Sequence, residues 1–203
     1  SISIYFKHEP LPLEMRNTQV GVVMDLATTM ISSMLNSRLE ELAQKPECNF
    51  IGAGVGYSNM IVAKTVNAFT VSIMPKPGKD AEAVQEVMQE VQRAVRHGFT
   101  GTEKFRAQEN LLSSVERLYQ NRDKQKNETY VNWYVRHFLD NSPAMDIATT
   151  YQMYQQLLQN LPTEVYSQLM AELAASTEKN FVFFAMYPEK DDVVIPTVDA
   201  MKN

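Results

Sequence analysis

Apolar and polar residues alternate at both ends of the chain, and this pattern predicts β-strands. Within residues 2–7, isoleucine and phenylalanine alternate with serine and tyrosine. A period of two is typical of a strand with one buried face. Pro10 and Pro12 then break the pattern, because proline lacks a backbone donor and fixes φ. An apolar run at residues 181–187 predicts a closing strand.

A different spacing follows, with apolar residues three and four positions apart, and it predicts one long helix over residues 13–44. Residues at this spacing share one face of a helix. The predicted stripe consists of Val20, Val23, Met24, Ala27, Met30, Ile31, Met34, Leu35, Leu39 and Leu42. Pro46 lies just beyond the expected end.

Two strand-like runs come next, at residues 50–57 and 61–74, and they predict a hairpin with Asn59 in its turn. Gly52, Gly54 and Gly56 occupy alternate positions of the first run. One face of this strand therefore carries no side chains, so another backbone could approach it closely. The same glycines do not indicate a dinucleotide-binding loop, because a strand follows them where that loop requires a helix.

From residue 80 the pattern is helical, with helices predicted over residues 81–97, 101–125, 127–139, 145–159 and 163–175. Gly98 is expected to end the first of these with a left-handed C-cap. Thr100 and Glu103 have the spacing of a capping box for the next. The helix at 127–139 carries Val131, Tyr134, Val135, Phe138 and Leu139. The aromatic residues Trp133, Tyr134, Tyr151 and Tyr154 are expected to pack in the core or at an interface.

Together these elements predict an α+β fold, with a mostly antiparallel sheet covered on one face by several helices. Without a composition shift or linker inside the chain, residues 1–190 are expected to form one domain and residues 191–203 a tail or linker. The chain begins at once with a strand and without an initiator Met. We therefore interpret it as a segment of a longer protein.

Composition excludes two classes of partner. The chain has 203 residues, of which 44% are hydrophobic and 21% charged, as in ordinary globular proteins. The net charge is -5 and no Lys/Arg cluster occurs, which argues against nucleic acid binding. The sequence has no run of 18 apolar residues, so no membrane span is expected.

Residues that could carry chemistry are few and scattered. The three histidines, His8, His97 and His137, lack the spacing of a metal site, and neither H-E-x-x-H nor H-x-x-E-H occurs. Zinc needs three or four protein ligands. Cys48 is the one cysteine, and we interpret it as a buried, inert thiol, although pairing with a histidine would make it a candidate nucleophile. The nucleophile-elbow motif G-x-S-x-G is absent.

Three runs of sequence resemble the insulinase/pitrilysin family of zinc peptidases, which includes mitochondrial processing peptidase. Residues 34–42 are similar to the family's S-R-L-x-x-x-L-R stretch, and residues 98–107 to its G-x-T-x-x-E-x-x-R-A helix junction. Residues 130–139 resemble a helix of large bacterial members. The motifs occur in the family's order, and the resemblance covers residues 15–187.

The resemblance implies repeated α/β domains that pair into halves and close around a peptide. The first domain of such enzymes carries the H-x-x-E-H zinc site, which is missing here. This segment is therefore expected to be the non-catalytic second domain of a long bacterial member. No catalytic, cofactor-binding or metal-binding residue is expected in it. Zinc is expected in the catalytic domain of the parent chain, and the implied partners are that domain and the peptide substrate.

One departure from the family concerns an Arg and a Tyr that bind substrate in many members. Alignment on the S-R-L stretch places these positions at Ala43 and Phe50, and neither side chain can donate a hydrogen bond. This fits a second domain or an inactive relative equally well.

Three functional readings follow. The first is a structural and substrate-chamber domain of a zinc metalloendopeptidase. The alternative is a pseudo-enzyme of the same fold that acts as a binding or assembly subunit. The third is a small-molecule enzyme, which a deep polar pocket lined by His97, His137 or Cys48 would support. The compartment of the bacterial parent stays open between periplasm and cytoplasm.

Overall fold

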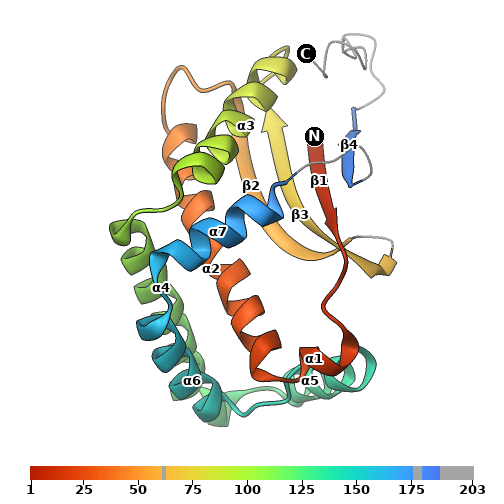
Figure 1. Ribbon diagram of the computed structural model, residues 1–203, viewed down its shortest axis with the longest axis vertical. Helices are drawn as coiled ribbons and strands as arrows, with labels where there is room; N and C mark the ends of the chain where they lie inside the picture. The colour runs from red at the N-terminus through yellow and green to blue at the C-terminus, as the bar shows by residue number, and fades with distance from the viewer. Residues whose placement is uncertain (61–62, 176–179, 188–203) are drawn as a thin grey trace.

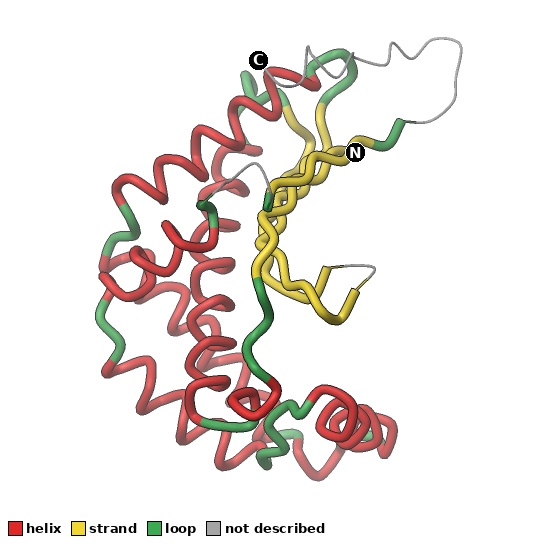
Figure 2. Tube along the Cα trace, turned by 45° about the vertical axis from the view of Figure 1, so that its right-hand side comes forward, coloured by secondary structure: helices red, strands yellow, loops and turns green. Residues whose placement is uncertain are grey.

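A computed structural model describes residues 1–60, 63–175 and 180–187, and it places a sheet on one side of the molecule and helices on the other (Figures 1 and 2). The sheet has the order β2-β3-β1-β4. Its strands are β1 (Ile2–His8), β2 (Phe50–Met60), β3 (Ala63–Pro75) and β4 (Phe181–Ala185). All three strand pairs are antiparallel. The predicted α+β class is confirmed; the predicted tail at 191–203 lies outside the described residues.

The helices form two layers on one face of this sheet. They are α1 (Leu13–Arg16), α2 (Gln19–Ala43), α3 (Asp80–His97), α4 (Gly101–Gln120), α5 (Asn127–Asp140), α6 (Ile147–Asn160) and α7 (Thr163–Leu173), with a short 3-10 turn η1 (Arg122–Lys124). α2 and α3 contact the strands, and α7 packs against both of these helices. α4 packs on α2, and α6 packs on α4.

The core lies between the sheet and the inner helices. The strands contribute alternate residues to it, as the period of two predicts: Ile2, Ile4, Phe6, Val55, Phe69, Val71 and Ile73. The predicted stripe of α2 supplies Met30, Ile31, Met34, Leu35 and Leu39, all fully buried. Burying each such side chain contributes about 1.5–3 kcal/mol, so this face is the main source of stability.

The long helix predicted over 13–44 is in fact two helices, so that prediction is wrong at its start. The chain turns at Asn17 and Thr18. The Thr18 hydroxyl accepts a bond from the Val20 N–H (3.2 Å) and donates to the Met15 carbonyl (2.6 Å), which caps α2. Position 21 requires glycine, because a Cβ there would lie 2.1 Å from the Arg16 carbonyl oxygen.

The β2–β3 hairpin is confirmed, but Asn59 does not lie in its turn. It pairs with Asn67 in the ladder, which extends to Met60 and Ala63. Residues 61–62, between the strands, are outside the described part of the chain. Ser58 and Asn59 are residue types that favour turns, but here they continue β2, because β3 is long enough to pair with them.

Several helix ends also differ from prediction. α4 ends at Gln120, where the Asn121 amide donates to the Arg117 carbonyl (2.8 Å), and η1 replaces the expected last turn. α7 begins at Thr163, as predicted, with Pro162 as its N-cap, but it ends at Leu173, before the predicted residue 175. The capping box of Thr100 and Glu103 is confirmed. Gly98 has the expected positive φ of 68°, but its ψ of -151° is not left-handed helical.

The largest difference concerns α5. No residue of this helix is buried, and its predicted apolar set is exposed, with Phe138 87% and Tyr134 67% accessible. Trp133 and Tyr134, which were expected to pack in the core or at an interface, are therefore both exposed in this chain.

Candidate functional site

The first two family-like motifs meet at one ion-pair cluster. Arg38, from the S-R-L stretch of α2, donates from Nη2 to the Glu103 carboxylate (3.0 Å) and to the Gly98 carbonyl (2.9 Å). Its Nη1 donates to Glu90 of α3 (3.2 Å). The guanidinium also lies 5.1 Å from the ring centre of Phe99. One arginine thus ties α2, α3 and the start of α4 together.

Electrostatics indicate that this cluster has a structural role. Burial raises the pKa of Glu103, but hydrogen bonds from Arg38 and Thr100 outweigh it and lower the pKa to about 2. A recess of about 440 Å³ beside the cluster is also lined by His97. Because Arg38 and Glu103 already bind each other, these two residues cannot serve as a free acid–base pair in the recess.

The structure places the remaining candidate residues apart from one another. The His8 Nε2 lies 2.8 Å from the Leu173 carbonyl, and the His137 Nδ1 lies 2.7 Å from the Ser142 carbonyl. Cys48 is buried and its Sγ donates to the Phe50 carbonyl (3.4 Å). Among the described residues, no group of three or more His, Cys, Asp or Glu side chains could hold a metal ion.

The two positions that align with the family's substrate-binding Arg and Tyr are also placed. Ala43 is the last residue of α2. Phe50 begins β2 and its ring is buried in the core, with 1% accessible. This end of α2 and β2 therefore offers no side-chain donor from these positions to a peptide.

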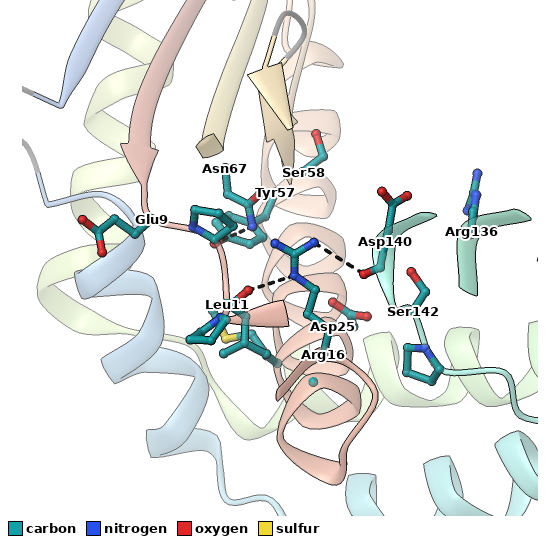
Figure 3. Close-up of a pocket in the computed structure, with 15 residues that line it drawn as sticks. Glu9, Leu11, Arg16, Asp25, Tyr57, Ser58, Asn67, Arg136, Asp140 and Ser142 are labelled. Carbon is teal, nitrogen blue, oxygen red and sulfur yellow. Dashed lines mark hydrogen bonds between the residues drawn. The ribbon is translucent and has the colours of Figure 1, made fainter. Parts of the chain in front are cut away.

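A polar cleft of about 810 Å³ opens where the sheet, the start of α2 and the end of α5 meet (Figure 3). Arg16 lies in its middle and donates from Nε to the Leu11 carbonyl (2.8 Å) and from Nη1 to the Asp140 carbonyl (3.5 Å). Its wall also includes Glu9, Asp25, Tyr57, Ser58, Asn67 and Arg136. The cleft therefore presents carboxylates, two guanidinium groups, hydroxyls and an amide.

Asp25 has the most perturbed environment in the cleft. Asp25 is exposed overall, but partial burial of its carboxyl raises the pKa of that group. The nearby Asp25 charge adds to burial in raising the pKa of the Tyr154 phenol. Across the wall, the Asn67 amide donates to the Tyr57 hydroxyl (3.2 Å). These groups can bind the amides and carbonyls of a peptide.

Asn36 is a functional residue that the sequence analysis missed. Its amide donates from Nδ2 to the Val55 carbonyl (3.1 Å), and its Oδ1 accepts from the Val55 N–H (2.7 Å). β2 is an edge strand, and such an edge exposes backbone groups that can pair with another strand. The clamp occupies both groups of Val55, so this part of the edge cannot take up a peptide as an extra strand.

The face of the sheet away from α2 and α3, called the bare sheet face, is covered by none of the described helices (Figure 2), although Tyr5 and Ala68 on this face are buried. Gly54 lies opposite Ser72 and Gly56 opposite Thr70 in the ladder. A Cβ at Gly52 or Gly56 would meet no atom within 4 Å. Of the described strand residues on this face, the large exposed ones are Met74 and Phe184. The alternating glycines thus do leave a smooth surface on the outside of β2.

The fold is that of domains found in M16 insulinase-type peptidases. The chain is similar to the first half of the periplasmic protease PqqL from Escherichia coli, with a TM-score of 0.76 and 16% identity over 90% of this chain and 38% of that one. It is also similar to an insulinase family protease from Yersinia pestis, with a TM-score of 0.77 and 11% identity over 99% of this chain and 42% of that one.

A third similar structure is an inactive domain of peptidase M16 from Pseudomonas fluorescens, with a TM-score of 0.60 and 14% identity over 90% of this chain and 39% of that one. This chain thus spans about two fifths of the length of these solved chains. No protein-family profile matches the sequence. No curated protein matches it. Among the described helices, none is long and apolar enough to cross a membrane.

Proposed function

We propose that this chain is a non-catalytic domain of a bacterial zinc metalloendopeptidase, in which it supports the catalytic domain and forms part of the wall around the peptide. The observation that carries the proposal is a peptidase-domain fold without a cluster of metal ligands among its described residues. Residues 1–190 would form this domain, and residues 191–203 would connect it to its neighbour.

Zinc would belong to the catalytic domain of the parent chain. The residues described here do not fit it, because His8 and His137 are each engaged with a different backbone carbonyl and zinc needs converging ligands. The role of this chain's own residues would be binding. The bare sheet face would pack against the neighbouring domain, and the polar cleft around Arg16 would contact the peptide backbone.

The first test uses the isolated 203-residue chain. After dialysis against a weak chelator, metal analysis should find far less than one zinc per chain, and added zinc should produce no cleavage of a mixed peptide library. The parent reading frame should encode H-x-x-E-H upstream of this segment. Stoichiometric zinc bound through the native histidines would contradict the proposal.

The second test examines the cleft in the parent enzyme. Arg136→Glu reverses a charge in the cleft wall and should raise KM for peptides several-fold while kcat changes little, as expected for lost ground-state binding. Arg106→Glu, on the exposed side of α4, is the matched control and should leave both constants unchanged. Equal KM values for the two variants would show that the cleft does not contact the peptide substrate.

A pseudo-enzyme that binds or assembles without cleaving anything is the second candidate. The similarity to an inactive domain of peptidase M16 supports this second candidate as much as it supports the first. The upstream sequence separates the two candidates: a parent without any H-x-x-E-H motif would make this chain part of a binding or assembly subunit.

A further inference from the structure

A second hollow, of about 650 Å³, adjoins the polar cleft where α5 comes near α2, α4 and α6. We call it the aromatic groove, because four aromatic side chains contribute to its wall: Tyr130, Trp133, Tyr134 and Tyr154. Asp25 and Arg136 line both hollows, so a ligand in one can extend into the other. A hollow of this size, with an aromatic lining and a few polar groups, is typical of a binding site.

The Asp25 carboxylate has no partner in the described part of the chain, where no residue donates a hydrogen bond to it or forms an ion pair with it. Arg16, in the adjoining cleft, donates to two backbone carbonyls instead. The Arg136 side chain points away from Asp25 (Figure 3). Partial burial raises the pKa of Asp25, and no described cation offsets that rise. This carboxylate has lost hydration without gaining a partner, so a cation would stabilise it.

Asp146 adds a second negative charge to the wall of the groove. Its carboxylate caps α6 by accepting from the Thr149 hydroxyl (2.7 Å) and the Thr149 N–H (2.9 Å), and these bonds lower its pKa. Two carboxylates, Asp25 and Asp146, therefore face one guanidinium, that of Arg136, in the described wall. This balance favours a cationic ligand over an anionic one.

The aromatic rings complete a site for a long basic side chain. Burial raises the pKa of the Tyr154 phenol, and the Asp25 charge adds to the rise, so this ring lies near the carboxylate. Tyr130 and Trp133 lie edge to face, with ring centres 5.6 Å apart. Aromatic faces attract cations, and the methylene stem of lysine or arginine packs on apolar surface.

We infer that the aromatic groove holds a lysine or arginine side chain of the bound peptide, with Asp25 as its counter-ion. An acidic side chain would be repelled by Asp25 and Asp146. A neutral apolar side chain would cover the Asp25 carboxylate without pairing it, which is costly for a charged group. A basic side chain forms a charge-assisted hydrogen bond. The inference rests on the proposed function, because it places the peptide backbone in the adjoining polar cleft.

Trp133 is the one tryptophan of the chain, so its fluorescence reports on the groove directly. The isolated chain is titrated with the pentapeptide Ala-Ala-Lys-Ala-Ala, acetylated and amidated so that lysine carries its only charge. The comparison peptides have norleucine or glutamate in place of lysine. The lysine peptide should bind roughly ten-fold more tightly than the norleucine peptide, as expected for a hydrogen bond to a charged group, and the glutamate peptide should give no saturable change.

Asp25→Asn keeps the shape of the side chain and removes its charge, so the lysine and norleucine peptides should then bind within about two-fold of each other. Glu109→Gln is the matched control, because it removes one charge from the exposed side of α4, outside the groove, and it should preserve the preference for lysine. Circular dichroism would check that both variants fold, and the peptide comparison in the unaltered chain needs no variant.

Three results would each overturn the inference: no saturable signal with the lysine peptide, equal binding of the lysine and norleucine peptides, or a preference that survives Asp25→Asn. None of these measurements involves zinc or cleavage. Zinc held by this chain would therefore refute the proposed function and leave the lysine preference standing, whereas a missing preference would refute the inference alone.

Discussion

Replacing Arg38 by methionine should destabilise the protein more than any other single charge removal among its described ion pairs. The change keeps most of the apolar stem and removes the guanidinium. It leaves Glu90, with only 9% of its side chain accessible, paired with the exposed Arg93. It also removes the donor to the Gly98 carbonyl, at the junction where α3 meets α4.

The expected loss is about 3 kcal/mol in the free energy of unfolding. Breaking a buried ion pair by removing one partner costs about 3–5 kcal/mol. The Arg38 and Glu103 side chains are 16% and 23% accessible, so water screens part of the interaction and the lower end of that range applies. For a domain of this size, such a loss lowers Tm by roughly 6–12 °C.

Urea denaturation followed by circular dichroism would measure the change, with an unaltered m value showing that the folded and unfolded states remain comparable. Lys79→Met is the matched control, because Lys79 and Glu82 form an ion pair in which both side chains are about half exposed. Its expected cost is under about 1 kcal/mol. If the two variants lost equal stability, the Arg38 cluster would not be a major source of stability, and it would not explain the motif residues Arg38 and Glu103.

Three further predictions concern buried or strained positions. Because the pKa of Glu103 lies at about 2 in the folded protein, below its ordinary value of 4.5, its contribution is complete above pH 5 and is lost as pH falls toward 2. The stability gap between wild type and Glu103→Gln, about 2 kcal/mol at pH 7 after screening, should therefore close over that range in urea titrations. Tyr166→Phe should raise stability by about 1 kcal/mol in thermal unfolding, because the Tyr166 hydroxyl is buried and has no hydrogen-bond partner among the described residues; a loss of stability would indicate a bound water. Gly98→Ala should cost about 2–3 kcal/mol, since φ is 68° and the new Cβ would lie 2.3 Å from the Ser167 hydroxyl. Urea denaturation would measure this loss, and an unchanged free energy of unfolding would contradict the prediction.

Much of the fold could be predicted because each of its elements has a local physical signal. The period of two in β1 and the stripe of α2 follow from side-chain geometry alone. The capping box at Thr100 depends on residues three positions apart. The break at Thr18 also has a local cause, which is the Thr18 cap together with the close approach of Gly21 to the Arg16 carbonyl. The spacing of apolar residues alone does not reveal it.

The candidate site was less predictable, because its residues are distant in sequence. Arg16, Asp25, Tyr57 and Arg136 line one cleft but share no motif or spacing. Asn36 gave a faint signal, as a polar residue beside the buried Leu35 of α2. Its role required knowledge that β2 is an edge strand, which depends on how the strands pair.

Sequence and structure disagree about the apolar face of α5. The periodic apolar residues of this helix predict that one of its faces is buried, and the structure leaves that face in solvent. Hydrophobic periodicity shows that one face of a helix is apolar, but it does not show which chain covers that face. A stripe of exposed aromatic and aliphatic side chains, fixed outward by bonds at both helix ends, is therefore better explained by a missing partner than by a weak helix. The Arg38 cluster is different, because its polar motif residues bind one another and hold α2, α3 and α4 together.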